Sequence, residues 1–507
     1  MACTCGCVAI TTLVLGVLLA IGCGVGIPLL TTFLSGVVDQ RVELLPNTTG
    51  YNNWLHPGGP IYMQFYIFNI VNPLEIEQGQ RPAVEQIGPF TYREHRIKTD
   101  VVFYTNGTAS YNEKKIFIFL PDRSIDSDNF TFTTINVPLL TTLEIMRKDN
   151  ISENLKKLFF NFVSNLHNEG LFIKRSVRQM IWGYDDDIFD FLRDISALLP
   201  NPVKIPKVFG LQQNASSAGI FDVYTGKDDP KNLGKIARWN GESHLHWWKD
   251  KYANMINGTD AVQFHPHLTR KEMLYLFNND VCRSLYSIYH SDVKLKGINL
   301  YRYTIPGKVF LNSSANPDNA GFCEPCLASG LLSLSSCKQG APVAISSPHF
   351  LYGDPQLVHN VTGLHPNLEE HATWIDIDPI TGFTMHARKR LQINAVVSPD
   401  NSLKGMKNVK YVVMPIVYLN ESAEIDKKHV DLYNQQLTIP FLIFHILEYA
   451  VPAFSGILIL VSAVVLFRIK RHGRILHVVE FGKYRQNVLD VAKIMTKRFI
   501  VIIFDES

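Results

Sequence analysis

The sequence of 507 residues lacks the motifs by which common enzyme classes are recognised. It contains no Gly-x-Ser-x-Gly nucleophile elbow, no His-Glu-x-x-His zinc motif and no glycine-rich loop that would cradle phosphates. Two histidine pairs, His244/His246 and His265/His267, invite a metal interpretation. Because neither pair has a third ligand at plausible spacing, we favour a structural role for them. The sequence therefore predicts a protein that is not an enzyme and holds no metal or cofactor.

Charge is missing from the first 38 residues, and a second long segment is nearly uncharged. Val8–Leu34 is an uncharged run that exceeds the roughly 20 residues a helix needs to cross a bilayer. The second segment, about Ile439–Phe467, ends at the basic cluster Arg468–Arg474, which the positive-inside rule places in the cytosol. A cleaved signal peptide is the alternative for the first segment. We disfavour it because Met1–Cys7 carries no positive charge and the apolar run is too long.

These two spans predict how the chain is divided by the membrane. We expect a cytosolic N-terminus (1–7), a transmembrane helix (8–34), a luminal or extracellular ectodomain (35–438), a second transmembrane helix (439–467) and a cytosolic tail (468–507). The formal net charge of +3 belongs to the tail, where nine Lys and Arg stand against four Asp and Glu. The ectodomain is close to neutral, so its charge does not favour nucleic-acid binding.

Glycosylation sequons and cysteines follow the same division. Nine Asn-x-Ser/Thr triplets lie between the two spans, and we predict glycans at Asn47, Asn106, Asn129, Asn150, Asn214, Asn257, Asn312, Asn360 and Asn420. Cys3, Cys5 and Cys7 precede the first span, where thiols are commonly palmitoylated. The ectodomain cysteines are Cys282, Cys323, Cys326 and Cys337. An even number in an oxidising compartment implies two disulfides, with three possible pairings.

The pattern of the ectodomain indicates a β-rich core with one helical insertion. Strand-like runs separated by turn signals occur at Ile61–Ile70, Ile116–Leu120, Leu300–Ile305, Leu391–Val397 and Val409–Tyr418. Their imperfect alternation is typical of a closed or double-sided antiparallel sheet. Helical spacing concentrates in Thr142–Leu199, with starts predicted near Asn150, Ser176 and Asp187 and a stop at Gly170.

Several motifs together resemble one family, the class B scavenger receptors, which include lysosomal integral membrane protein type 2. They are Gln64-Phe-Tyr-Ile-Phe-Asn-Ile-Val-Asn-Pro73, Gly88-Pro-Phe-Thr-Tyr-Arg-Glu94, Trp182-Gly-Tyr184, Met255-Ile-Asn-Gly-Thr-Asp260, Cys282-Arg-Ser284, Asp318-Asn-Ala-Gly-Phe-Cys323, Pro348-His-Phe350, Asp376-Ile-Asp-Pro-Ile-Thr-Gly382 and Leu419-Asn-Glu-Ser422. They occur in family order from residue 35 to about 467. The tail beyond His472 is longer than the family's tails and has no intact acidic dileucine signal.

The resemblance implies an α+β fold: an antiparallel β-barrel ectodomain with an apical helical bundle near 142–199, flanked by two transmembrane helices. It implies a tunnel through the barrel, ligands such as lipoproteins, fatty acids or anionic phospholipids, and residence at the plasma membrane or in endosomes and lysosomes. The lysosomal branch also delivers a luminal hydrolase, which is our alternative function. Cys282 and Cys337 match positions that pair in the family, which leaves Cys323 to bond Cys326.

The helical bundle is the predicted ligand platform. Its basic and apolar residues are Arg147, Lys148, Lys156, Lys157, Phe159, Phe160, His167, Lys174, Arg175 and Arg178. Basic groups among exposed apolar groups suit anionic lipid, although an ordinary solvated helix face is an equal alternative. His167 is predicted to add pH dependence. Gly16, Ala20 and Gly24 place small residues on one face of the first span, a pattern that lets two helices approach closely and that we interpret as a homodimer contact.

Overall fold

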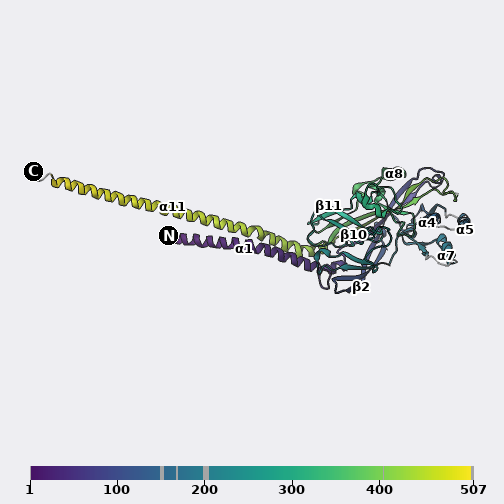
Figure 1. Cartoon of the computed structure of the whole chain (residues 1–507), viewed down its shortest axis with the longest axis horizontal. Helices are drawn as coiled ribbons and strands as arrows, with labels where there is room; N and C mark the ends of the chain where they lie inside the picture. Colours follow the sequence, from purple (N-terminus) through teal and green to yellow (C-terminus); the bar gives the residue numbers. More distant parts are fainter. Residues whose placement is uncertain (1, 149–152, 167–169, 198–204, 404, 504–507) are drawn as a thin grey trace. The chain divides into compact units, whose positions relative to one another are not determined.

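The computed structural model describes residues 2–503, apart from 149–152, 167–169, 198–204 and 404. The chain divides into two units. One consists of residues 1–36 and 431–507, and the other of Val37–Val430. The first unit contains two long helices, and the second contains a large sheet with a cluster of short helices (Figure 1).

Within the described residues, thirteen strands form one antiparallel sheet that nearly closes into a barrel. The sheet order is β10 (Met273–Asn278), β11 (Arg283–Leu295), β12 (Ile298–Thr304), β15 (Trp374–Ile377), β16 (Thr384–Val397), β17 (Val412–Glu424), β1 (Ile61–Ile70), β2 (Val84–Phe103), β3 (Thr108–Phe119), β8 (Ser216–Tyr224) and β9 (Ile236–Trp239), with β14 (Val343–Ser346) on β16 and β13 (Leu332–Ser333) on β14. This confirms the predicted fold class, and β1 has the predicted bounds.

A single peptide joins the two free edges of this sheet. The carbonyl of Gly258 accepts from Ile236 N–H on β9 at 2.8 Å, while Thr259 N–H donates to the Tyr275 carbonyl on β10 at 3.2 Å. Gly258 has a φ of +88°, and a Cβ there would lie 1.9 Å from the Tyr275 oxygen. Only glycine fits this position, which explains its place in the Met255–Asp260 motif.

The helical insertion forms one end of the second unit (Figure 1). It consists of α4 (Val137–Lys148), α5 (Glu153–Asn165), α6 (Val177–Trp182) and α7 (Asp187–Ala197), with the small sheet of β4 (Thr131–Ile135) and β5 (Phe172–Ser176). Ser176 and Gln179 form a capping box at the start of α6, where the helix was predicted. Helix α5 ends five residues before the predicted stop at Gly170.

Short elements complete the second unit and its connections. These are α2 (Thr49–Leu55), α3 (Pro73–Glu77), η1 (Pro121–Arg123), β6 (Tyr184–Asp185), β7 (Val208–Phe209), η2 (Pro230–Asn232), η3 (Gly307–Phe310), η4 (Pro317–Phe322), η5 (Pro348–Phe350), α8 (Pro355–His359), α9 (Leu368–His371), α10 (Lys427–Tyr433) and η6 (Asn434–Thr438).

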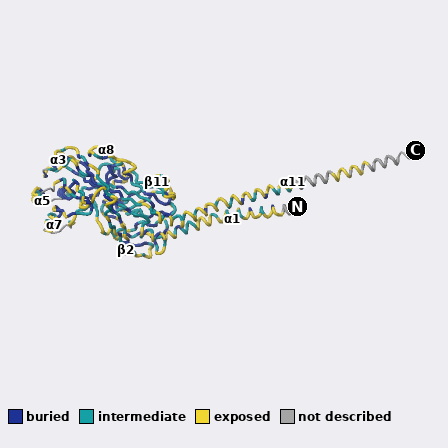
Figure 2. Tube along the Cα trace, turned by 180° about the vertical axis from the view of Figure 1, so that it is seen from behind, coloured by how far each residue is buried: buried dark blue, intermediate teal, exposed yellow. Residues whose placement is uncertain are grey.

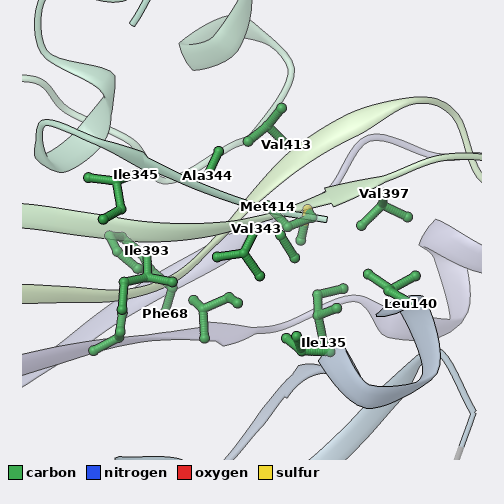
Figure 3. Close-up of a cluster of buried hydrophobic side chains, with 14 of the residues drawn as sticks. Phe68, Ile135, Leu140, Val343, Ala344, Ile345, Ile393, Val397, Val413 and Met414 are labelled. Carbon is green, nitrogen blue, oxygen red and sulfur yellow. The ribbon is translucent and has the colours of Figure 1, made fainter. Parts of the chain in front are cut away.

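The main hydrophobic core joins the barrel to the helical cluster. Phe68 of β1, Ile135 of β4 and Leu140 of α4 lie with residues of β14, β16 and β17, as Figure 3 shows. Figure 2 shows that buried residues are concentrated in this second unit. A smaller apolar cluster, around Phe264, Tyr303 and Ile377, is separate from it. The helical cluster is therefore anchored by a core that it shares with the sheet.

The first unit contains most of α1 (Ala2–Val42), whose last six residues belong to the second unit, and all of α11 (Ile439–Ile503). Both contain a stretch that is long and apolar enough to cross a membrane, Cys7–Val42 and Lys427–Arg471. The two helices contact each other, because the Thr12 and Ser462 hydroxyls lie 2.7 Å apart. Gly16 also faces α11, since a Cβ there would lie 2.8 Å from Ile459 Cγ1.

Candidate ligand surface and barrel interior

The aromatic residues of α5 turn toward the core and not toward solvent. Phe159 is fully buried, and Phe160 is half-buried with its ring 5.8 Å from that of Phe159. Phe162 stacks on Phe191 of α7 at 4.3 Å. The prediction that Phe159 is an exposed ligand contact is therefore wrong, because the apolar face of an amphipathic helix packs against its neighbours. Leu158, 49% exposed, is the apolar side chain that α5 presents to solvent.

Three of the predicted basic residues have partners within the protein. Arg147 donates to Asp400 at 2.8 Å, and Lys156 donates to Glu153 at 2.9 Å. The Arg175 guanidinium lies 4.4 Å above the Tyr184 ring. Because these three cations already interact with groups of the protein, they attract an anionic ligand less strongly than unpaired cations would.

Three other predicted cations remain exposed. Lys157 on α5, Lys174 on β5 and Arg178 on α6 have no ion pair within 4.0 Å among the described residues. We call these three residues the exposed cation set. His167 lies outside the described residues, and so does the side chain of Lys148.

The ectodomain cysteines form two disulfides in the pairing that the resemblance implies. Cys282 is bonded to Cys337 across 55 residues, and Cys323 is bonded to Cys326. Cys282 is almost fully buried, and its carbonyl accepts from the Trp248 indole at 3.0 Å. Cys7, one of the three cysteines predicted to be palmitoylated, is free and exposed; the side chains of Cys3 and Cys5 lie outside the described part.

Most described sequon asparagines are accessible, but one is not. Those exposed are Asn47, Asn106, Asn129, Asn214 and Asn360, while Asn257 and Asn312 are half-buried and Asn150 lies outside the described residues. Asn420 is only 5% exposed, and its amide donates to Gln64 at 2.8 Å inside the sheet. A glycan there would have to displace that packing, so Asn420 is the predicted site that we expect to be unmodified.

Charged side chains form a network inside the barrel that the sequence did not predict. Glu94, Arg96 and Lys98 alternate along β2 and therefore share the interior face with buried Tyr92. Arg96 donates to Glu94 at 2.7 Å and also to Glu421 of β17. Lys389 Nζ lies 3.3 Å from the other oxygen of Glu421.

The electrostatics of this network favour the ionised state of Glu421. Burial would raise the pKa of Glu421, but Lys389 and Arg96 outweigh it and hold the pKa well below its usual range. The side chains of Arg96 and Glu421 are 11% and 16% exposed. The interior therefore carries a charged belt, defined here as Glu94, Arg96, Lys98, Lys389 and Glu421.

A stacked histidine pair lies outside this belt. The rings of His349 and His371 stack at 4.4 Å, and His349 Nε2 lies 2.6 Å from Gln86 Oε1. The Nδ1 atoms of His349 and His371 accept from the N–H groups of His365 and Asn367, so both nitrogens are deprotonated. Burial, and for His349 also the neighbouring histidine, lowers the pKa values to about 3 and about 4.

The second of the two histidine pairs considered for metal binding, His265/His267, has acidic partners. His265 lies 2.8 Å from Glu272, and His267 lies 2.9 Å from Asp39. Among the described residues, no group of three or more His, Cys, Asp or Glu is arranged to hold a metal ion.

For the charged belt, the sequence contains one signal, which is the alternation of charged residues Glu94, Arg96 and Lys98 along a strand.

Comparisons with known proteins agree with this architecture. Residues 14–466 match the CD36 family. The chain is 36% identical to Lysosome membrane protein 2 of Homo sapiens over 416 residues, 81% of this chain and 84% of that protein. It is 32% identical to Scavenger receptor class B member 1 of Bos taurus over 452 residues, 89% of this chain and 87% of that protein.

These matches place the chain at the membrane. Lysosome membrane protein 2 of Mus musculus is 38% identical over 406 residues, 77% of this chain and 81% of the relative. With the two apolar helices, the relatives identify a two-pass protein of the plasma membrane or the endosomal and lysosomal membranes. Proteins of this kind are receptors and not enzymes. The chain belongs to the CD36 family and has the role of a class B scavenger receptor.

Proposed function

We propose that the helical cluster binds anionic lipids or lipoproteins and that lipid then passes through the barrel interior to the membrane. The observation that carries the binding step is the exposed cation set, Lys157, Lys174 and Arg178. Cations without an internal partner attract anionic head groups. Leu158 adds exposed apolar surface on the same helix as Lys157.

The lipid passage through the barrel interior would be lined by apolar side chains and by charged ones. The main core and the smaller cluster around Phe264 supply apolar side chains, while the charged belt supplies polar ones. An amphiphile moving along the barrel would therefore meet Arg96 and Glu421, whose ion pair it must pass. This arrangement favours lipids with a charged or zwitterionic head over purely apolar ones.

The binding step is tested with the full-length protein in phosphatidylcholine nanodiscs, mixed with vesicles that contain phosphatidylserine. The triple variant Lys157→Gln, Lys174→Gln, Arg178→Gln should bind these vesicles more than tenfold more weakly, at about 1 kcal/mol per charge near the surface. The matched control replaces three exposed lysines elsewhere, Lys231, Lys271 and Lys294, with Gln. Equal loss in both triple variants would show that net charge, and not the helical cluster, governs binding.

A second candidate is a sorting receptor that delivers a luminal hydrolase. The identity of 36–38% to Lysosome membrane protein 2, against 32% to Scavenger receptor class B member 1, favours it. Imaging of the full-length chain, with a truncation at His472, separates the candidates. Residence at the cell surface supports the lipid receptor, and lysosomal residence that depends on the tail supports the sorting receptor.

We also propose self-association through the first span, but part of its small-residue face is covered by α11. Gly16 is buried against Ile459 of the same chain, whereas a Cβ added at Gly24 would meet nothing within 4 Å apart from its own turn of the helix. Only the part of the small-residue face around Ala20 and Gly24 is free for a second copy. Gly24→Ile should lower crosslinked dimer if that contact forms, and unchanged crosslinking would refute it.

A further inference from the structure

Helix α11 carries an open apolar groove in its membrane-spanning part. The groove has a volume of about 700 Å³ and runs along one side of the helix from Gly456 to Phe467. Gly456 leaves it open at one end, because a Cβ at that position would meet no atom within 4 Å. Between its two ends the groove is lined by the apolar side chains of Leu460, Ala463 and Val464.

The groove lies beside the contact between the two helices, and the contact does not fill it. Helix α1 approaches α11 at Ser462 and at Ile459, and Ile459 also belongs to the lining of the groove. Ser455 and Ser462 are 2% and 3% exposed, whereas Leu460 is 67% and Phe467 66% exposed. Figure 2 shows this stretch of α11 largely in the colours of exposed and intermediate residues. Because α1 does not cover these side chains, the groove would face the lipids of a bilayer.

Two arginines close the groove at its other end. Arg468 and Arg471 belong to its lining and are one helical turn apart, so they lie on the same side of the helix. Both are exposed, and neither has an ion pair within 4.0 Å in the part of the chain that the structure describes. Guanidinium groups bind phosphate oxygens through two parallel hydrogen bonds.

The length of the groove matches one leaflet. Gly456 to Phe467 spans about 16 Å at 1.5 Å per residue, against about 15 Å for half of the hydrocarbon core. Under the positive-inside rule the arginines lie at the cytosolic interface, where the leaflet is rich in anionic lipids. We propose that the groove binds one anionic phospholipid of the cytosolic leaflet, with an acyl chain along Gly456–Phe467 and its phosphate on Arg468 and Arg471.

The experiment uses the full-length protein in phosphatidylcholine nanodiscs with a small fraction of photoactivatable phosphatidylserine or, in parallel, photoactivatable phosphatidylcholine. Crosslinked peptides are mapped by mass spectrometry. Phosphatidylserine should be enriched over phosphatidylcholine on residues 456–471. Arg468→Gln with Arg471→Gln should lower that enrichment by roughly 30-fold, the effect of two basic residues near the surface.

Two matched controls separate the groove from general surface charge. Lys470→Gln removes the same charge next to the groove without belonging to its lining, and it should lower the enrichment less than either single arginine variant. Gly456→Leu blocks one end of the groove without changing charge and should lower the crosslink on residues 456–471. Gly24→Leu, at an equally open glycine of α1, should leave it unchanged.

Three results would overturn the proposal. They are an equal loss in Lys470→Gln and the arginine variants, an unchanged crosslink in Gly456→Leu, and a crosslink from α11 of one copy to α11 of another in place of lipid. The last result would assign the groove to a homodimer. Binding of vesicles to the helical cluster is measured separately and does not decide this test.

Discussion

The two disulfides should contribute very different amounts of stability, because they close loops of very different length. Cys282 and Cys337 are 55 residues apart, and Cys323 and Cys326 are 3 residues apart. In the loop-entropy model these bonds stabilise the fold by about 4 and about 2 kcal/mol. The comparison is between two double variants, Cys282→Ala with Cys337→Ala and Cys323→Ala with Cys326→Ala.

The expected shifts in melting temperature follow from the size of the ectodomain unit, residues 37–430. At about 2.1 cal/mol/K of unfolding entropy per residue, about 400 residues give roughly 0.8 kcal/mol/K. The first double variant should therefore melt about 5 °C lower and the second about 2 °C lower. Differential scanning fluorimetry of the full-length protein in detergent is the assay. Equal shifts, or a larger shift for the short loop, would refute the entropic argument.

Three further predictions concern the belt, the histidine pair and the buried sequon. Glu421→Gln should lower stability by about 3 kcal/mol, because it breaks a buried ion pair, whereas the matched change Asp292→Asn, at an exposed ion pair, should lower stability far less. Since the pKa of Glu421 is lowered, its contribution is present above the unfolded pKa and should be equal at pH 7.4 and 5.0; a much smaller effect at pH 5.0 would contradict this. His349 and His371 have lowered pKa values, so only the unfolded chain takes up their protons, and stability should fall as pH drops below about 6.5, by about 2 kcal/mol per histidine at pH 5.0. His371→Gln should flatten the pH dependence of the melting temperature, and an unchanged slope would exclude the pair as its cause. Glycopeptide mapping should find Asn420 unmodified, and a glycan there would show that this part of the sheet is more open than described.

The sequence predicted elements whose signal is local. Ile61–Ile70 is a continuous apolar and aromatic run, and its bounds as β1 agree with the prediction. Phe172–Ser176 was included in the helical region, because the partner that makes it a strand, β4, lies about 40 residues earlier. Short strands depend on such distant partners more than on their own residues.

The candidate site was less predictable, because burial is decided by packing. Helical spacing identified the apolar face of α5, but it did not show that Phe159 turns inward while Leu158 faces solvent. A sequon likewise contains no information about exposure, as Asn420 illustrates. The ion pair of Arg96 with Glu421 joins strands that are 325 residues apart, so no local pattern could reveal it.

The pairing of β1 with β17 has a consequence for the biosynthesis of the protein. Ile61 pairs with Ala423, so the first long strand of the sheet borders the last one, about 360 residues later in the chain. At 5–20 residues per second, translation takes roughly 20 to 70 seconds to produce that partner. During this interval one edge of β1 lacks its hydrogen-bonding neighbour, while the hairpin partner β2 is already present. The ectodomain cannot complete its sheet until the ribosome has nearly reached the second membrane helix, so a nascent chain stalled or truncated before Val412 would expose a strand edge that chaperones must cover.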